Sequence, residues 1–229
     1  QELNCLVTGA SSGIGKEISL ELSKIAKHIY ITSRNVNALE EVHDQIVLNS
    51  CKCTIVPLDL CEEMGIENLA EEILRKDQHL DILILSAGII RDLSPIDSIN
   101  LEKLKEILNL NYLANFRMIK SFHPLLKNSK NANLGVISSI KDLSKNKYWG
   151  IYQPIMTALN ELLLMYADEN KNTSIKVNIF NPIAVNTKFR ETIMPGEDKT
   201  KISSPQKVAI KIIQHILKTK NTGKFVEIT

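Results

Sequence analysis

Short apolar segments recur along the chain, and a longer amphipathic stretch follows each of them. This alternation predicts parallel strands joined by crossover helices. The predicted strands are Leu3–Val7, His28–Thr32, Cys53–Pro57, Ile82–Leu85, Leu134–Ser138 and Lys176–Phe180, with Lys224–Ile228 as a candidate seventh. The pattern therefore predicts an α/β fold, with a doubly wound parallel sheet of six to seven strands and helices on both faces.

The amphipathic stretches give the expected helices and loops. Helices are expected to begin near Gly13, Val36, Glu63, Leu101, Tyr152 and Pro205. Ser204 is a good N-cap residue for the last of these helices, and Pro205 suits its first helical position. The segments Lys141–Ile151 and Asn186–Ser203 lack a pattern and are predicted to be loops. No repeat or linker interrupts the chain, so residues 1–229 are predicted to form one domain.

Composition narrows the classes of partner. The chain has 229 residues, 44% of them hydrophobic, and a net charge of only +2, with the charges scattered. No basic stripe favours nucleic acid or an anionic membrane, so a small-molecule partner is expected. No apolar run approaches the ~20 residues of a membrane span, and the first residues contain no signal-peptide pattern.

The four cysteines do not suggest a metal site. None of them stands in the paired CxxC spacing of a zinc site, so no metal is expected and the thiols are predicted to be reduced and buried. Reduced thiols favour a cytoplasmic location. These residues are Cys5, Cys51, Cys53 and Cys61.

A glycine-rich turn, Thr8–Gly15 with the sequence TGASSGIG, follows the first strand and opens the first helix. This is the context of a Rossmann-type dinucleotide-binding turn. Glycines let the backbone approach a pyrophosphate, and the free N–H groups of a helix start favour its charge. The candidate cofactor-binding residues in the turn are Gly9, Ser11, Ser12, Gly13, Ile14 and Gly15.

Two other interpretations of the same turn are weaker. Gly9–Gly13 also satisfies the GxSxG pattern of a hydrolase elbow, but no acid and histidine are marked as partners, and His215 lies in an amphipathic helical run. A P-loop does not fit, because Ala10 stands where its first glycine belongs and Glu17 follows Lys16 in place of Ser or Thr.

Motifs along the whole chain resemble the short-chain dehydrogenase/reductase family. Besides TGASSGIG, these are Ala87-Gly88 after the fourth strand, Asn111 in a helix, Ser139, Tyr152 thirteen residues later, and the Asn181–Thr187 segment. The resemblance implies that Ser139, Tyr152 and Asn111 are catalytic and that Ala87, Gly88 and Thr187 bind cofactor. It implies an oxidoreductase that interconverts a carbonyl and an alcohol. Leu85-Ser86 departs from the family's Asn-Asn, which places the asparagine support of the sheet in doubt.

The end of the second strand bears on the choice of cofactor. An acidic residue there would bind the adenosine ribose hydroxyls and repel a 2′-phosphate, whereas this chain has Ser33 and Arg34. A guanidinium pairs well with phosphate, so NADP(H) is favoured and NAD(H) is possible. Arg34 as a solvated loop cation is the alternative. Asp59, with Leu60 after it, resembles the family residue that binds the adenine, or else is a surface turn aspartate.

Met156 stands where the resemblance implies a lysine, four residues after Tyr152. A tyrosine has an ordinary pKa of ~10 and needs nearby positive charge to exchange a proton at neutral pH. Activity is therefore expected to be weakened, unless Lys141, Lys145 or Lys147 substitutes from the preceding loop. The competing hypothesis is a non-catalytic nucleotide-binding protein that acts as a sensor or as a partner subunit.

An apolar stripe follows Tyr152 at helical spacing, formed by Ile155, Leu159, Leu162 and Leu163. It is interpreted as a packing face or a subunit face. With the predicted Leu101–Leu126 helix, it matches the four-helix dimer interface that the resemblance implies. A homodimer or homotetramer is therefore expected, and a heteromer remains an alternative.

Overall fold

A single parallel sheet of seven strands organises the chain in a computed structural model that describes residues 3–62, 64–139 and 147–228. The strand order is β3-β2-β1-β4-β5-β6-β7, and every neighbouring pair is parallel. The strands are β1 Leu3–Thr8, β2 Ala26–Ser33, β3 Lys52–Pro57, β4 Ile82–Leu85, β5 Asn133–Ile137, β6 Lys176–Pro182 and β7 Lys224–Ile228. The predicted fold class, including the seventh strand, is confirmed.

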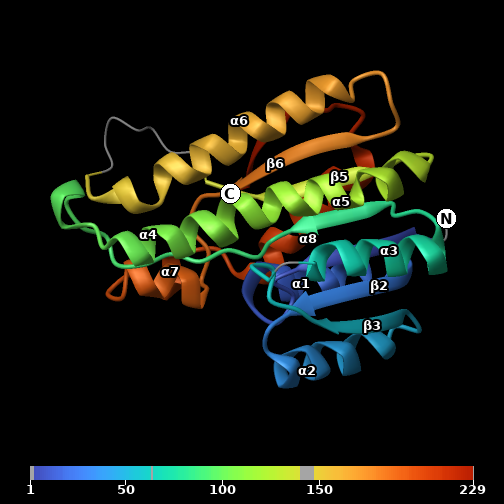
Figure 1. Ribbon diagram of the computed structural model, residues 1–229. Coiled ribbons are helices and arrows are strands. Elements are labelled where there is room, and N and C mark those ends of the chain that lie inside the picture. The colour runs from blue at the N-terminus through green and yellow to red at the C-terminus, as the bar shows by residue number, and fades with distance from the viewer. Residues whose placement is uncertain (1–2, 63, 140–146, 229) are drawn as a thin grey trace.

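Helices cover both faces of this sheet and form two separate apolar cores (Figure 1). One face carries α3 Gly65–Asp77, α5 Asn115–Asn128 and α6 Gln153–Glu169. The other carries α1 Gly13–Leu22, α2 Val36–Val47 and α8 Pro205–Lys218. Because both faces are buried, the strands have near-continuous apolar sequences. In the described part of the chain, no helix is long and apolar enough to cross a membrane.

Most helix starts agree with the sequence pattern to within two residues. The α8 helix begins at Pro205, and the Ser204 hydroxyl accepts a hydrogen bond from the backbone N–H of Lys207 at 3.3 Å. The α6 helix begins at Gln153, with Tyr152 as its N-cap residue. The α3 helix begins at Gly65, and Glu63 lies outside the described residues.

The continuous helix expected over Leu101–Leu126 is interrupted. It consists of α4 Leu101–Leu108, a π-helical turn η2 Asn109–Ala114, and α5, which ends at Asn128. A π turn leaves a backbone carbonyl without its usual helical donor, and the Asn115 side chain donates to the carbonyl of Asn111 at 2.7 Å. The hydrophobic pattern does not reveal this insertion. The hydrogen bond that compensates for it comes from an amide side chain, and such a bond leaves no mark in the spacing of apolar residues.

The prediction of a loop over Asn186–Ser203 was wrong. This segment contains α7 Lys188–Ile193 and a 3₁₀ turn η5 Lys199–Lys201. Thr187 caps α7 by accepting from the Arg190 backbone N–H at 3.2 Å, and the Arg190 guanidinium pairs with both carboxylate oxygens of Glu197 at 2.7 Å. In the other predicted loop, Trp149–Ile151 is a 3₁₀ turn, η4, and residues 140–146 lie outside the described residues. A third such turn, η1, spans Ile96–Ser98.

The apolar stripe of α6 packs inside the chain. Ile155, Leu159 and Leu163 are buried in the core that α6 shares with α5, and Leu162 is partly buried against it. The stripe is therefore a packing face, and its interpretation as a subunit face was wrong. Figure 1 shows α5 and α6 running along the same face of the sheet. Their inner surfaces position the residues that line one wall of the cleft described below.

Candidate functional site

A cleft of about 770 Å³ opens at the carboxyl edge of the sheet. In open parallel sheets, ligands bind at this edge where the strand order reverses, which here lies between β1 and β4. All but one of the sequence-predicted site residues line the cleft, with Gly15 as the exception. Those in the lining are Gly9, Ser11, Ser12, Gly13, Ile14, Arg34, Asp59, Leu60, Ala87, Gly88, Asn111, Ser139, Tyr152 and Thr187.

The centre of the cleft is a close approach between the glycine-rich turn and the loop after β4. Gly9 has a φ of +66°, and a Cβ there would lie 2.9 Å from both Cα and N of Ala87. The Thr8 hydroxyl oxygen accepts backbone N–H groups from Ser86 at 3.0 Å and from Ala87 at 3.1 Å. Thr8 thus links the end of β1 to the loop after β4.

The start of α1 points into the cleft beside this contact. Ser12 is the extended N-cap residue, but its side chain makes no capping hydrogen bond. Gly13 has a φ of +56°, and a Cβ there would lie 3.3 Å from Cγ2 of Thr187, on the opposite wall. The first N–H groups of a helix have no acceptor within the helix, and they favour an anion. These residues fit the pyrophosphate of a dinucleotide.

Gly15 has a packing role in the same turn. A Cβ there would lie 2.4 Å from the carbonyl oxygen of Gly9 and 3.2 Å from the Ser86 hydroxyl. The helix start and the turn can therefore approach only without a side chain at this position. Gly15 shapes the turn from behind instead of lining the cleft.

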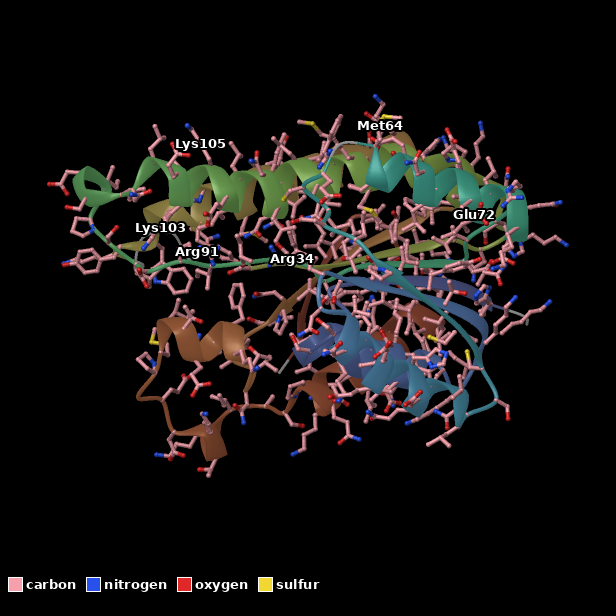
Figure 2. The ribbon with its side chains drawn as sticks, turned by 60° about the horizontal axis from the view of Figure 1, so that its bottom comes forward. Arg34, Met64, Glu72, Arg91, Lys103 and Lys105 are labelled. Carbon is pink, nitrogen blue, oxygen red and sulfur yellow. The ribbon has the colours of Figure 1, made fainter. Side chains whose placement is uncertain are left out.

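Arg34 and Asp59 line the end of the cleft that adjoins the carboxyl ends of β2 and β3. The Arg34 side chain is 69% exposed, and its Nη1 lies 3.8 Å from Oδ2 of Asp59. Such an exposed and long contact leaves the guanidinium available to a ligand phosphate. Asp59 also accepts the backbone N–H of Cys61 at 2.9 Å. Arg34 lies in the connection between β2 and α2, and in the view of Figure 2 it is below the green α4–α5 helices.

Asn111 anchors the loop after β4. It is 2% exposed; its Oδ1 accepts from the Ile89 backbone N–H at 2.9 Å, and its Nδ2 donates to the Ile89 carbonyl at 2.8 Å. The same Nδ2 lies 3.9 Å from the sulfur of Met156. The π turn thus presents Asn111 to the loop after β4, and Gly88 lies directly beside it.

Ser139 and Tyr152 come from the end of β5 and the start of α6. Asn160 of α6 accepts from the Ser138 hydroxyl at 2.5 Å and donates to the Ser139 carbonyl at 3.2 Å, which fixes the strand end against the helix. The Tyr152 ring makes edge contacts with Trp149 and Phe189, at centroid distances of 6.0 and 5.8 Å. Burial raises the pKa of the Tyr152 hydroxyl above its ordinary value, so it holds its proton at neutral pH.

Met156 lies one helical turn beyond Tyr152, since its backbone N–H donates to the Tyr152 carbonyl at 3.2 Å. It is 4% exposed and lines the cleft between Tyr152 and Asn111. A thioether carries no charge and cannot donate a hydrogen bond. Lys147 is exposed, and Lys141 and Lys145 lie outside the described residues.

Several residues that shape the cleft were missed in the sequence. Thr8 was visible as part of TGASSGIG but was not assigned a role. Asn160 and Phe189 had no local signal, because their partners Ser138 and Tyr152 lie 22 and 37 residues away in the chain. Such contacts depend on how the elements pack, which spacing alone does not show.

The fold and the cleft together are those of a Rossmann-type α/β protein. A family model described as short chain dehydrogenase matches residues 4–198. The chain belongs to the short-chain dehydrogenase/reductase family.

Relatives in this family are oxidoreductases by name. The uncharacterized oxidoreductase YciK of Escherichia coli strain K12 is 28% identical over 203 residues, which are 87% of this chain and 80% of that protein. A rhamnolipids biosynthesis 3-oxoacyl-(acyl-carrier-protein) reductase of Pseudomonas aeruginosa is 29% identical over 184 residues, which are 77% of this chain and 70% of that protein.

Solved structures of similar proteins contain the phosphorylated dinucleotide. A short chain dehydrogenase from Shigella flexneri 2a strain 301, complexed with NADP, is 26% identical with a TM-score of 0.91, covering 99% of this chain and 97% of that one. One from Escherichia coli CFT073, complexed with NADPH, is 25% identical with a TM-score of 0.91, covering 99% and 96%.

Replacing Gly15 by alanine tests the packing of the turn. A Cβ 2.4 Å from the Gly9 carbonyl oxygen forces backbone to move. We expect the free energy of unfolding to fall by about 1–3 kcal/mol, despite the better helix propensity of alanine. Chemical denaturation measures this difference.

Gly196→Ala is the matched control, because a Cβ there meets nothing within 4 Å. Its free energy of unfolding should stay within about 0.5 kcal/mol of the wild-type value. Equal stability of the two variants would contradict the packing role of Gly15.

Proposed function

We propose that this protein is an NADP(H)-dependent oxidoreductase that interconverts a carbonyl and an alcohol. The observation that carries the proposal is that Ser139, Tyr152 and the glycine-rich turn line one continuous cleft. When bound, the nicotinamide supplies or accepts the hydride. The residues of the chain bind and orient the ligands and hold the proton.

The phosphate turn and Arg34 support the choice of cofactor. The start of α1 offers N–H groups to the pyrophosphate, and the guanidinium of Arg34 offers a bidentate contact to a 2′-phosphate. No acidic residue stands at the end of β2, because its last residue is Ser33 and Arg34 follows it. NADP in the similar Shigella structure favours the same choice. NAD(H) is expected to bind more weakly.

Two hydroxyl groups carry the proposed chemistry. Tyr152 donates its proton to the carbonyl oxygen in reduction, and Ser139 donates a hydrogen bond to the developing oxyanion. Asn111 positions the loop after β4 through its two hydrogen bonds to Ile89. Asn160 positions Ser139 through the backbone carbonyl of that residue.

The wall around Tyr152 favours an uncharged substrate with an apolar group next to its carbonyl. Trp149 and Phe189 contact the tyrosine ring on two sides, and Ile193 of α7 lines the same wall. Arg190, which also lines the cleft, has its guanidinium occupied by Glu197. An apolar substrate group gains free energy by leaving water for such a wall.

Met156 makes the proposed activity weak. We infer that it replaces the family's lysine, so the positive charge that would lower the pKa of Tyr152 is missing from α6. General acid–base terms are typically worth ~10²–10⁴ in rate. A nucleotide-binding protein without turnover is the competing function, and the apolar Met156 beside Asn111 is the observation that favours it.

A homo-oligomer in the cytoplasm completes the proposal. Exposed apolar side chains follow the outer surface of the α4–α5 segment, which supports a contact with a second subunit. They are Leu101, Leu108, Leu113 and Phe116.

Arg34→Ala tests the choice of cofactor. The dissociation constant for NADPH should rise about tenfold through loss of the contact to the 2′-phosphate, while that for NADH should change less than about twofold. Isothermal titration calorimetry measures both.

Arg75→Ala removes the same charged group from the last turn of α3, outside the cleft lining, and should leave both constants unchanged. An equal loss of NADPH and NADH affinity in Arg34→Ala would argue against a phosphate contact.

Met156→Lys tests the proposed catalytic defect. An ammonium group one turn from Tyr152 lowers the pKa of its hydroxyl, so kcat for carbonyl reduction should rise on the order of 10²-fold. Steady-state kinetics with NADPH and a panel of apolar ketones measure the gain. Met156→Leu keeps the apolar volume and should show none. No gain in Met156→Lys, with the fold and NADPH binding intact, would favour the non-catalytic function.

The pH dependence of alcohol oxidation gives a second test. Oxidation needs ionised Tyr152, and burial raises the pKa of its hydroxyl. The wild-type kcat/KM for oxidation should therefore rise by up to about tenfold per pH unit across the neutral range without a plateau. In Met156→Lys the rise should level off at lower pH. A wild-type plateau near neutral pH would mean that another cation already lowers the pKa of Tyr152.

A further inference from the structure

Arg117, on the first turn of α5, reaches across to the turn that follows β3. Its Nη2 donates to the backbone carbonyl of Leu60 at 2.5 Å, and its Nη1 donates to the carbonyl of Glu62 at 3.1 Å. These partners lie 57 and 55 residues away in the chain. The contact therefore links two elements that no local pattern connects.

The turn that Arg117 holds forms the adenosine end of the cleft. Leu60 is buried, and both Asp59 and Leu60 line the cleft. The turn also has internal hydrogen bonds, from the Glu62 N–H to the Asp59 carbonyl at 3.0 Å and from the Cys61 N–H to the Asp59 side chain at 2.9 Å. Arg117 adds the bonds that fix this small unit relative to α5.

A guanidinium suits this task better than other side chains. It is planar, always charged, and carries donors in a fixed fork, so one group can hold two carbonyl oxygens at once. A lysine ammonium is a flexible point charge and holds the same pair with less geometric constraint. Glutamine has a single amide group and cannot reproduce the fork.

The same helical segment also holds the loop after β4, at the middle of the cleft. Asn111, in the π turn just before α5, makes two hydrogen bonds to Ile89 in that loop. Arg117 follows it by six residues and makes two hydrogen bonds to the turn after β3. The η2–α5 segment therefore sets the positions of two loops of the cleft.

We propose that Arg117 is a positioning residue for the adenosine end of the cofactor site. It holds the Leu60–Glu62 turn in place before the nucleotide arrives, so the nucleotide does not have to order that turn on binding. It contributes to affinity for the adenosine half and takes no part in the proton transfer. This inference rests on the proposed function, because it takes a phosphorylated dinucleotide as the ligand.

The experiment compares Arg117→Gln, Arg117→Lys and the control Lys120→Gln, which removes an exposed positive charge from the same helix. Calorimetry gives the dissociation constants for adenosine 2′,5′-bisphosphate, which represents the adenosine half, and for NADPH. Native-state hydrogen exchange follows the backbone N–H groups of Cys61 and Glu62, with that of Ile89 in the loop after β4 as the reference.

The dissociation constant for the bisphosphate should rise about tenfold in Arg117→Gln and about threefold in Arg117→Lys, and less than about twofold in Lys120→Gln. Exchange at Cys61 and Glu62 should accelerate in Arg117→Gln while exchange at Ile89 is unchanged. A general loss of stability would instead accelerate hydrogen exchange in both loops, and this result would overturn the proposal.

Three further results would also overturn it. If wild type binds the bisphosphate and Arg117→Gln binds it equally well, Arg117 does not position the site. If Lys120→Gln loses as much affinity for the bisphosphate as Arg117→Gln does, the effect comes from net charge. If wild type binds neither the bisphosphate nor NADPH, the proposed function fails and the nucleotide role of Arg117 fails with it, which is a different result from an unchanged variant.

Discussion

The contact between the glycine-rich turn and the loop after β4 is the constraint on which the cleft depends. Gly9 fits against the backbone of Ala87 only because it has no side chain, and the Thr8 hydroxyl accepts two N–H groups from that loop. This contact closes the point where the strand order reverses between β1 and β4. It brings together the start of α1, where we propose that the phosphates bind, and the loop that Asn111 holds. A side chain at position 9 would separate these two halves of the site.

The helices on one face of the sheet then determine the shape of the cleft. The π turn directs Asn111 to Ile89, while α5 directs Arg117 to the turn after β3. The α6 helix contributes Asn160 behind Ser139, and Met156 beside Tyr152. In the proposed function, α5 supports cofactor binding and α6 supports the chemistry, through different residues. A protein of this kind can keep its proposed cofactor site while the pKa of Tyr152 stays high, as the apolar Met156 favours.

Much of the fold was predictable from the sequence, because buried parallel strands give apolar runs and Gly9, Gly13 and Pro205 mark boundaries by their backbone preferences. The π turn was hidden, since Asn115 supplies a hydrogen bond that the apolar spacing does not reveal. The α7 helix was missed because it is short and rich in charged residues. Ser139 and Tyr152 were found through their spacing, whereas Asn160 and Arg117 act on backbone carbonyls far away in the chain, and only tertiary packing brings them together.

We propose that the cleft is a working NADP(H) site in a chain whose Tyr152 has no lysine on α6 to assist it. Direct calorimetric titration of the wild-type protein with NADPH, and separately with NADH, tests this proposal. We expect a dissociation constant for NADPH on the order of micromolar and weaker binding of NADH. If neither nucleotide binds, the cleft is not an NADP(H) site, and protein partners become the next candidates.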